Sequence, residues 1–182
     1  GEQHGCVHLT ELHDLAQRFP DHVQVFSIGV NDTGQEIDGI RSGDGPMHSL
    51  VVGTHHGNEY GATEVALAFA ESVAESPITG ETVFVIPVLN VSGYDHRTRE
   101  ELGRDPNRDY EGPCGSDGPW HLRSTKALAD FIGQENIIAS VTLHTYSPFV
   151  LYPWGFSTHD TKTEYNDLYI QLAKSATVES GY

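Results

Sequence analysis

A histidine and a glutamate three residues apart, His56 and Glu59, have the types and the spacing to bind one metal ion. They lie in the stretch 53–61 (GTHHGNEYG), between an apolar run at 49–52 and a helical pattern at 62–74. A strand end would fix the imidazole, and the first helical turn would carry the carboxylate back toward it. Zinc takes such a pair, with one more histidine, in catalytic sites that keep a position open for water. Taken alone the pair is a weak signal, since a surface pair has the same spacing.

A third ligand is predicted at another strand end. Three apolar runs, ending near residues 52, 88 and 141, lead into polar stretches, and the third of these contains His144. In open α/β sheets, sites form beyond the carboxyl ends of the strands. We therefore expect His56, Glu59 and His144 to meet as the two-histidine, one-glutamate set of a catalytic zinc site.

The segment 90–120 is long, rich in glycine and proline, and without periodicity, which is typical of a functional or disordered loop. It holds four of the ten basic residues, namely Arg97, Arg99, Arg104 and Arg108. Arginine binds carboxylates bidentately, and a cation beside a metal can stabilise an oxyanion. Charge clustering alone favours two interpretations equally: arginines that bind substrate beside a metal, and a solvated loop with surface ion pairs.

The elements that must position these residues follow from hydrophobic periodicity and turn signals. Helices are expected at 9–19 with Thr10 as N-cap, 62–74, 122–132 up to Gly133, and after a capping box at 161–164. Strands are expected at 23–28, 36–41, 47–53, 82–88, 137–143 and 149–152, the first two as a hairpin. Strands that alternate with helices predict an α/β fold, with a mixed β-sheet flanked by helices in three layers and one domain over 1–182.

Periodicity also assigns buried faces to two helices and burial to one strand. The helix at 62–74 should bury Ala62, Val65, Phe69 and Val73. The last helix should bury Tyr165, Leu168, Leu172 and Ala176. The strand at 137–143 is apolar enough to be predicted as buried.

Composition narrows the class of protein. A chain of 182 residues with 37% hydrophobic residues is long and apolar enough for one folded domain. No apolar run reaches the roughly 18–20 residues that insert into a membrane. The net charge of −16 argues against nucleic acid or anionic membrane as partner. Cys6 and Cys114 would form one disulfide in an oxidising compartment or stay as thiols. We expect a secreted or periplasmic protein, although a cytoplasmic one is compatible, and the oligomeric state stays open.

Four blocks of the chain, in order, resemble the motifs of the zinc carboxypeptidase family (carboxypeptidase A type, peptidase M14). The stretch 53–60 resembles its first zinc motif, and 105–110 (DPNRDY) its Asp-x-Asn-Arg-Asn-aromatic block. The stretch 90–94 resembles its Asn-Pro-Asp-Gly-aromatic block, with Val91 and Ser92 in place of Pro-Asp. The stretches 143–147 and 151–155 (LYPWG) resemble its third-ligand block. The resemblance covers nearly the whole chain.

The resemblance implies a metal centre. His56, Glu59 and His144 would bind one zinc ion, and His55 is a rival for His56 that lacks the ligand spacing to Glu59. Asp105 would accept a hydrogen bond from His56 and fix its tautomer. In the family, the peptide bonds at the positions of 145–146 and 153–154 are cis, so the same is expected here.

The resemblance also implies substrate contacts. Asn107 and Arg108 would bind the C-terminal carboxylate of a peptide or protein substrate, and Thr145 and Tyr146 would line the cleft. Arg99 would be the catalytic arginine that polarises the scissile carbonyl, with Arg97 and Arg104 as rivals.

The family's general-base glutamate and its closing tyrosine lie beyond the region that 161–182 matches. We therefore expect 1–182 to be the N-terminal portion of a catalytic domain whose C-terminal strands are missing. Such a chain should bind zinc with little or no hydrolysis, and should leave an exposed sheet edge.

Two alternatives to a metallocarboxypeptidase stay open. One is a zinc amidohydrolase of the aspartoacylase or succinylglutamate desuccinylase kind, which Asn58 favours, whereas Tyr146 and the stretch 151–155 favour the carboxypeptidase. The other is a non-catalytic zinc-binding pseudo-peptidase that has lost its base.

Overall fold

The computed structural model describes residues 5–112, 119–155, 159 and 161–178. The strands are β1 (Val23–Val30), β2 (Glu36–Ser42), β3 (Met47–Val52), β4 (Glu81–Ile86) and β5 (Ala139–Thr142). The helices are α1 (Gly5–Arg18), α2 (Tyr60–Glu75), α3 (Val91–His96), η1 (Pro106–Arg108), α4 (Arg123–Gln134) and α5 (Asn166–Thr177). The choice between a Cys6–Cys114 disulfide and two thiols falls outside the described part, because Cys114 and the side chain of Cys6 are not described.

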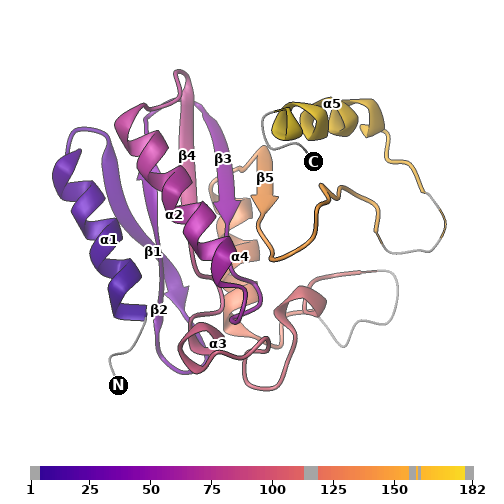
Figure 1. Cartoon of the computed structure of the whole chain (residues 1–182), viewed down its shortest axis with the longest axis horizontal. Coiled ribbons are helices and arrows are strands. Elements are labelled where there is room, and N and C mark those ends of the chain that lie inside the picture. The colour runs from indigo at the N-terminus through magenta and orange to yellow at the C-terminus, as the bar shows by residue number, and fades with distance from the viewer. Residues whose placement is uncertain (1–4, 113–118, 156–158, 160, 179–182) are drawn as a thin grey trace.

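The five strands form one mixed sheet in the order β1-β2-β4-β3-β5. The pairs β1/β2 and β2/β4 are antiparallel, and the pairs β3/β4 and β3/β5 are parallel. Helices α1 and α2 cover one face and α4 covers the other, which gives three layers (Figure 1). The predicted α/β fold class is therefore confirmed, and the carboxyl ends of β3 and β5 lie side by side.

The core has one hydrophobic cluster on each face of the sheet. The cluster under α1 and α2 includes Leu12, Leu15 and Val85, and the cluster under α4 includes Leu50, Phe84 and Phe131. In α2 the residues that face the sheet are mostly small, including Ala62, Ala66, Ala70 and Ala74. Small side chains at these spacings bring the helix close to the strands.

The expected burial of Val65 is wrong, because 56% of this residue is exposed. It lies off the alanine stripe of α2, and the stripe rather than the larger side chain faces the sheet. Phe69 is partly buried against the cluster, and Ala62 and Val73 are buried, as predicted.

The segment expected as a loop at 90–120 contains two short helices, α3 and η1. Helix α1 starts before Thr10, so Thr10 is not an N-cap, and Gly133 lies inside α4 instead of ending it. The predicted capping box does not form, since α5 begins after Tyr165 without a side-chain cap. The expected strand at 149–152 is also absent, because these residues form no ladder.

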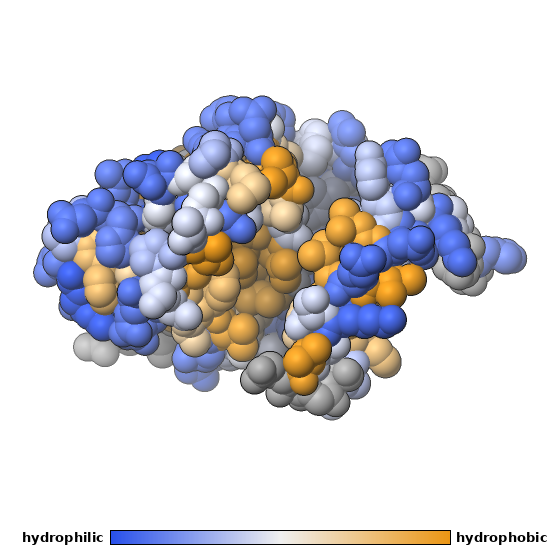
Figure 2. Space-filling model, turned by 90° about the horizontal axis from the view of Figure 1, so that it is seen from above, coloured by the Kyte–Doolittle hydropathy of each residue, from blue (hydrophilic) through white to orange (hydrophobic). Residues whose placement is uncertain are grey.

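The last described part of the chain is far more exposed than its sequence pattern predicted. All four residues of β5 are exposed, and no residue of α5 is buried. The burial predicted for Tyr165, Leu168, Leu172 and Ala176 is therefore wrong. Figure 1 shows α5 standing away from the sheet, and Figure 2 shows hydrophobic residues on both sides of a hollow. Within the described ranges, no strand pairs with β5 on the side away from β3.

None of the helices in the described ranges has the length and apolar character to cross a bilayer.

Candidate metal centre

A tight turn between β3 and α2 carries the first two predicted ligands. At Gly57, a Cβ atom would come within 2.1 Å of the backbone of Gly93, so only glycine allows this approach. The amide of Gly57 donates to the carbonyl of Arg99 at 3.2 Å. The turn is thus pressed against the segment after β4, and it holds His56 and Glu59 at the carboxyl end of β3.

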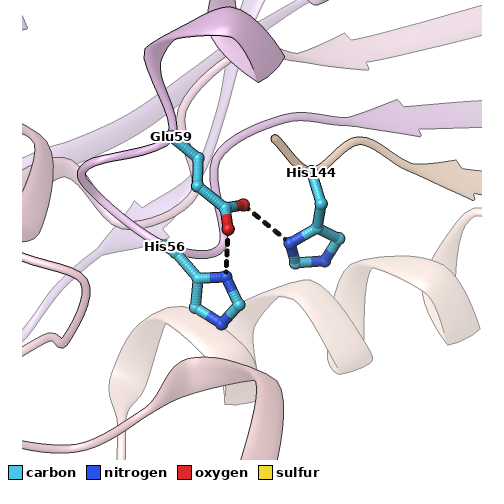
Figure 3. A group of neighbouring side chains, drawn as sticks. All are labelled: His56, Glu59 and His144. Carbon is cyan, nitrogen blue, oxygen red and sulfur yellow. Dashed lines mark hydrogen bonds and ion pairs between the residues drawn. The ribbon is translucent and has the colours of Figure 1, made fainter. Parts of the chain in front are cut away.

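The three predicted ligands meet at one point (Figure 3). Glu59 Oε1 lies 2.9 Å from His56 Nδ1, and Glu59 Oε2 lies 2.8 Å from His144 Nδ1. The three ligand atoms all lie within 4.8 Å of one another. Two imidazole nitrogens and a carboxylate that converge in this way fit the donor set of a catalytic zinc site.

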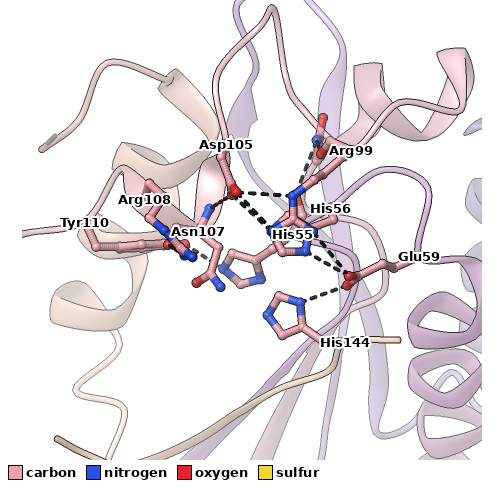
Figure 4. Close-up of polar contacts among 10 residues, drawn as sticks. His55, His56, Glu59, Arg99, Asp105, Asn107, Arg108, Tyr110 and His144 are labelled. Atoms are coloured by element: carbon pink, nitrogen blue, oxygen red, sulfur yellow. Dashed lines mark hydrogen bonds and ion pairs between the residues drawn. The ribbon is translucent and has the colours of Figure 1, made fainter. Parts of the chain in front are cut away.

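Asp105 holds His56 from behind. His56 Nε2 lies 3.0 Å from Asp105 Oδ1, so the second ring nitrogen is occupied while Nδ1 faces Glu59. The same carboxylate accepts from the amide of Asn107 at 2.9 Å and from Arg99 Nη2 at 3.0 Å (Figure 4). Burial alone would raise the pKa of Asp105, but these hydrogen bonds outweigh it and hold the pKa below its usual range. Asp105 therefore stays an acceptor that orients the imidazole.

Of the three candidate arginines, Arg99 lies beside the ligand group. Its guanidinium binds Asp105 and comes within 3.9 Å of Glu59 Oε1. Arg97 ends α3 in the left-handed conformation (φ 59°), and Arg104 pairs its backbone with Glu101.

Asn107 and Arg108 lie in η1, which begins directly after Asp105, and both residues are exposed. Arg108 Nη1 donates to the carbonyl of Asn107 at 2.9 Å. Figure 4 places both side chains near the metal group, on the side where His55 and Tyr110 lie. An exposed guanidinium beside a metal centre is available to a carboxylate ligand.

Thr145 and Tyr146 directly follow His144 and differ in their surroundings. Thr145 packs on the start of α2, where a Cβ atom at Gly61 would come 2.7 Å from its Cγ2. Tyr146 is 95% exposed. The peptide bonds Thr145–Tyr146 and Pro153–Trp154 are both cis, which confirms the prediction for these two bonds.

A buried histidine that the sequence offered only as a rival ligand has a different place. His55 is 2% exposed, and its Nε2 lies 2.7 Å from the hydroxyl of Tyr110. Burial, followed by the nearby His144 and His56, lowers the pKa of His55 to about 3, so its imidazole is neutral. Its position directly after a buried strand was the available signal, and it pointed equally to a ligand or a structural residue.

Asp109 fixes the segment 105–110 to α4, although no pattern in the sequence singles this residue out. This carboxylate is 4% exposed and accepts from the backbone amides of His121 and Leu122, both at 2.9 Å. It also accepts from the hydroxyl of Thr125 at 2.5 Å. The stretch 105–110 is thereby tied both to the metal centre and to the helix on the far face of the sheet.

Comparison with known proteins decides the family. The zinc carboxypeptidase (peptidase M14) family model matches residues 8–181. The chain belongs to the zinc carboxypeptidase family. Its relatives include an "inactive metallocarboxypeptidase ECM14" of Blastomyces gilchristii, 27% identical over 79% of this chain. A carboxypeptidase B of Astacus astacus is 24% identical over 86% of this chain.

Solved structures of this family share the fold. Thrombin-activatable fibrinolysis inhibitor matches 96% of this chain with a TM-score of 0.86 at 19% identity. Carboxypeptidase A of Helicoverpa armigera matches 92% with a TM-score of 0.78 at 17% identity. The chain covers 54% and 51% of these two structures. It covers 33% of the Blastomyces relative and 65% of the Astacus relative.

Proposed function

We propose that this chain is the metal-binding portion of a zinc metallocarboxypeptidase, which hydrolyses the C-terminal peptide bond of a peptide or protein. The observation that carries the proposal is the convergence of His56 Nδ1 and His144 Nδ1 on the two oxygens of Glu59. Asp105 behind His56 supports it, because metal-bound histidines usually donate their other N–H to a carboxylate or carbonyl.

One zinc ion is the proposed cofactor, held by His56, Glu59 and His144. When bound, zinc supplies a Lewis acid and lowers the pKa of its water toward about 7. The neighbouring residues of the chain would orient the substrate and stabilise charge.

Arg99 is the proposed oxyanion-stabilising residue. It uses Nε and Nη2 on Asp105, which leaves donors on Nη1 at the side of Glu59. A donor fixed in this way can bind the negative charge that develops on a scissile carbonyl oxygen. Its ion pair with Asp105 also holds the guanidinium in one orientation.

Asn107 and Arg108 are the proposed binding site for the substrate's C-terminal carboxylate. Arg108 presents an exposed guanidinium, whose fork matches a carboxylate, and the preceding Asp105 caps the turn that carries it. Thr145 and Tyr146 would line the cleft beside His144.

A general base remains unassigned. Among the described residues, the carboxylates that contact the metal group are Glu59 and Asp105, and histidines engage both. We therefore expect the 182-residue chain to bind zinc and carboxylates with little or no hydrolysis.

The relatives named inactive favour a second candidate, a non-catalytic zinc-binding pseudo-peptidase. The family match favours both over a zinc amidohydrolase. Residues 1–182 are proposed to be a single portion of a catalytic domain that works outside the cytoplasm.

Zinc content is the direct test. Purified wild type, His144→Ala and the control His13→Ala, which changes an exposed histidine of α1, would be dialysed with zinc and analysed by mass spectrometry. We expect about one zinc per chain in wild type and His13→Ala, and a clear loss in His144→Ala. Equal zinc content in all three would contradict the proposal.

Substrate class needs a second assay. Hydrolysis of an N-acyl dipeptide and of an N-acyl amino acid would be measured for the zinc-loaded chain and for the protein as its gene encodes it. Cleavage of the dipeptide alone supports the carboxypeptidase, and cleavage of the N-acyl amino acid alone supports the amidohydrolase. Zinc binding without cleavage of either compound by the gene-encoded protein supports the pseudo-peptidase.

A further inference from the structure

The two adjacent histidines of the metal turn are held by the two ends of one short segment. His56 bonds to Asp105 through Nε2 at 3.0 Å, and His55 bonds to Tyr110 through Nε2 at 2.7 Å. The proposed carboxylate-binding pair, 107–108, lies between these two anchors (Figure 4). The two bonds therefore act as two fixed points for the part of the chain that would bind the substrate's carboxylate.

Tyr110 itself rests on a firm base. Its ring meets Trp120 edge-on, with ring centroids 5.7 Å apart and an interplanar angle of 86°. The neighbouring Asp109 is tied to the start of α4 by hydrogen bonds from Leu122 and Thr125. The hydroxyl of Tyr110 is thus presented to His55 from a rigid support.

A contribution to stability does not by itself explain a histidine at position 55. His55 is 2% exposed, and its Nδ1 has no hydrogen-bond partner among the described residues. A buried polar group that is half satisfied is less favourable than an apolar side chain of similar size. An aromatic ring such as phenylalanine would fill the same space without an unpaired nitrogen, so packing alone does not explain the histidine.

We propose that His55, through its bond to Tyr110, is a positioning residue that sets where Asn107 and Arg108 stand relative to the metal. This inference rests on the proposed function, because it assumes that this pair binds a substrate carboxylate. Asp109 fixes this end of the segment to α4, and the bond from Tyr110 to His55 ties the same end to the metal turn. Displacement by about 1 Å is enough to weaken a bidentate contact strongly.

The test uses three variants of the zinc-loaded chain: His55→Phe, Tyr110→Phe and the double variant. Tyr165→Phe, at a residue 58% exposed, is the matched control. Zinc affinity would be measured first, followed by the affinity for an N-acyl dipeptide and for its C-terminal amide. We expect zinc affinity within threefold of wild type and a loss of about tenfold for the free carboxylate. The amide should bind as before, and the double variant should lose no more than either single variant.

Hydrogen exchange gives a readout that needs no substrate. The amides of Arg108 and Asp109, which bond to Asp105 and Pro106 within the segment, should exchange about tenfold faster in His55→Phe. Amides of α4 should be unchanged, and the thermal midpoint of the double variant should be equal or higher. Faster exchange confined to the segment, with α4 and the thermal midpoint unaffected, would show that the variant displaces the segment and does not unfold the chain.

Three results would overturn the inference: unchanged exchange at Arg108 and Asp109, a zinc loss equal to the carboxylate loss, or an additive double variant. If wild type fails to prefer the carboxylate over the amide, the proposed binding role of Asn107 and Arg108 fails instead. In that case faster exchange still supports the His55–Tyr110 anchor, and the failure lies with the proposed function.

Discussion

The two sides of the metal centre are held in different ways. On one side, the turn between β3 and α2 supplies His56 and Glu59, whose side chains are 4% and 12% exposed. On the other, His144 follows the edge strand β5 and its side chain is 32% exposed. The first side is enclosed by α2 and the segment 90–112, whereas on the second side β5 pairs with β3 alone among the described strands.

The two histidine ligands differ in the hydrogen bonds that orient their rings and in the burial of the backbone that carries them. His56 has both nitrogens engaged, by Glu59 and Asp105. His144 bonds to Glu59 through Nδ1, and it follows a strand whose four residues are all exposed. The metal centre is therefore pre-organised from the β3 side, and Glu59 connects the two sides.

The largest expected contrast is in stability. Leu50, on β3, is 1% exposed in the core, while Leu172, on α5, is 53% exposed. We expect Leu50→Ala to lower the free energy of unfolding by about 2–5 kcal/mol, since it leaves a cavity. Leu172→Ala should change it by less than about 0.5 kcal/mol. Urea denaturation of both variants measures the difference, and equal losses would mean that α5 is packed as firmly as the core.

The next contrast is in metal affinity. Asp105→Asn keeps the shape of the side chain but weakens its bond to His56, and such changes beside a metal ligand cost about 10–100-fold in affinity. Competition with a zinc chelator would measure this loss. Asp130→Asn, on the exposed part of α4, is the control and should leave zinc affinity unchanged. An Asp105→Asn variant with wild-type affinity would show that pre-organisation from the β3 side is unimportant.

The sequence predicted the enclosed side better than the exposed one. The spacing of His56 and Glu59 and the strand-end rule for His144 are local signals, and the three residues do come together. Periodicity identified the apolar side of α5 but not what covers it, so the burial predicted for Leu168 and Leu172 was wrong. The burial predicted for Val65 was wrong because the alanines of α2, and not its larger side chains, face the sheet.

Long-range pairs of common residue types could not be predicted. His55 and Tyr110 are 55 positions apart, and nothing in either local sequence requires their contact. The bonds of Asp109 to 121–125 depend on where α4 begins, which becomes clear only in the folded chain. The motif at 105–110 was found through the family resemblance, because it has no periodicity of its own.

Two buried carboxyl groups near the substrate segment should respond to pH in opposite directions. Burial would raise the pKa of Asp109, but bonds from Thr125, His121 and Leu122 outweigh it and hold the pKa below its usual range. Its contribution to stability is therefore fully present above pH about 4 and is lost as the pH falls through the folded-state pKa. We expect Asp109→Asn to cost about 2 kcal/mol at neutral pH and to flatten the acid limb of the unfolding curve.

The contribution of Glu101 to stability should change with pH in the opposite direction. Burial is the main cause that raises its pKa, and it accepts from Ser124 while its Oε1 has no partner among the described residues. Its contribution is present below pH about 4 and is lost as the pH rises through the raised folded-state pKa. Glu101→Gln should match wild type near pH 4 and exceed it near pH 8 in urea denaturation, with the exposed Glu164→Gln as control. A variant that is less stable at pH 8 would contradict this assignment.

The smallest expected effect is on the exposed side, at the edge strand itself. Val141 is 55% exposed on β5, whose outer edge pairs with no other strand in the described ranges. An uncovered apolar edge favours strand-to-strand association, and a lysine on it opposes association. We expect Val141→Lys to reduce concentration-dependent association in sedimentation velocity, while the free energy of unfolding changes by less than about 0.5 kcal/mol. Val65→Lys, at an exposed position on α2 away from this edge, controls for the added charge. If both variants reduce association equally, net charge is the cause and the edge is not.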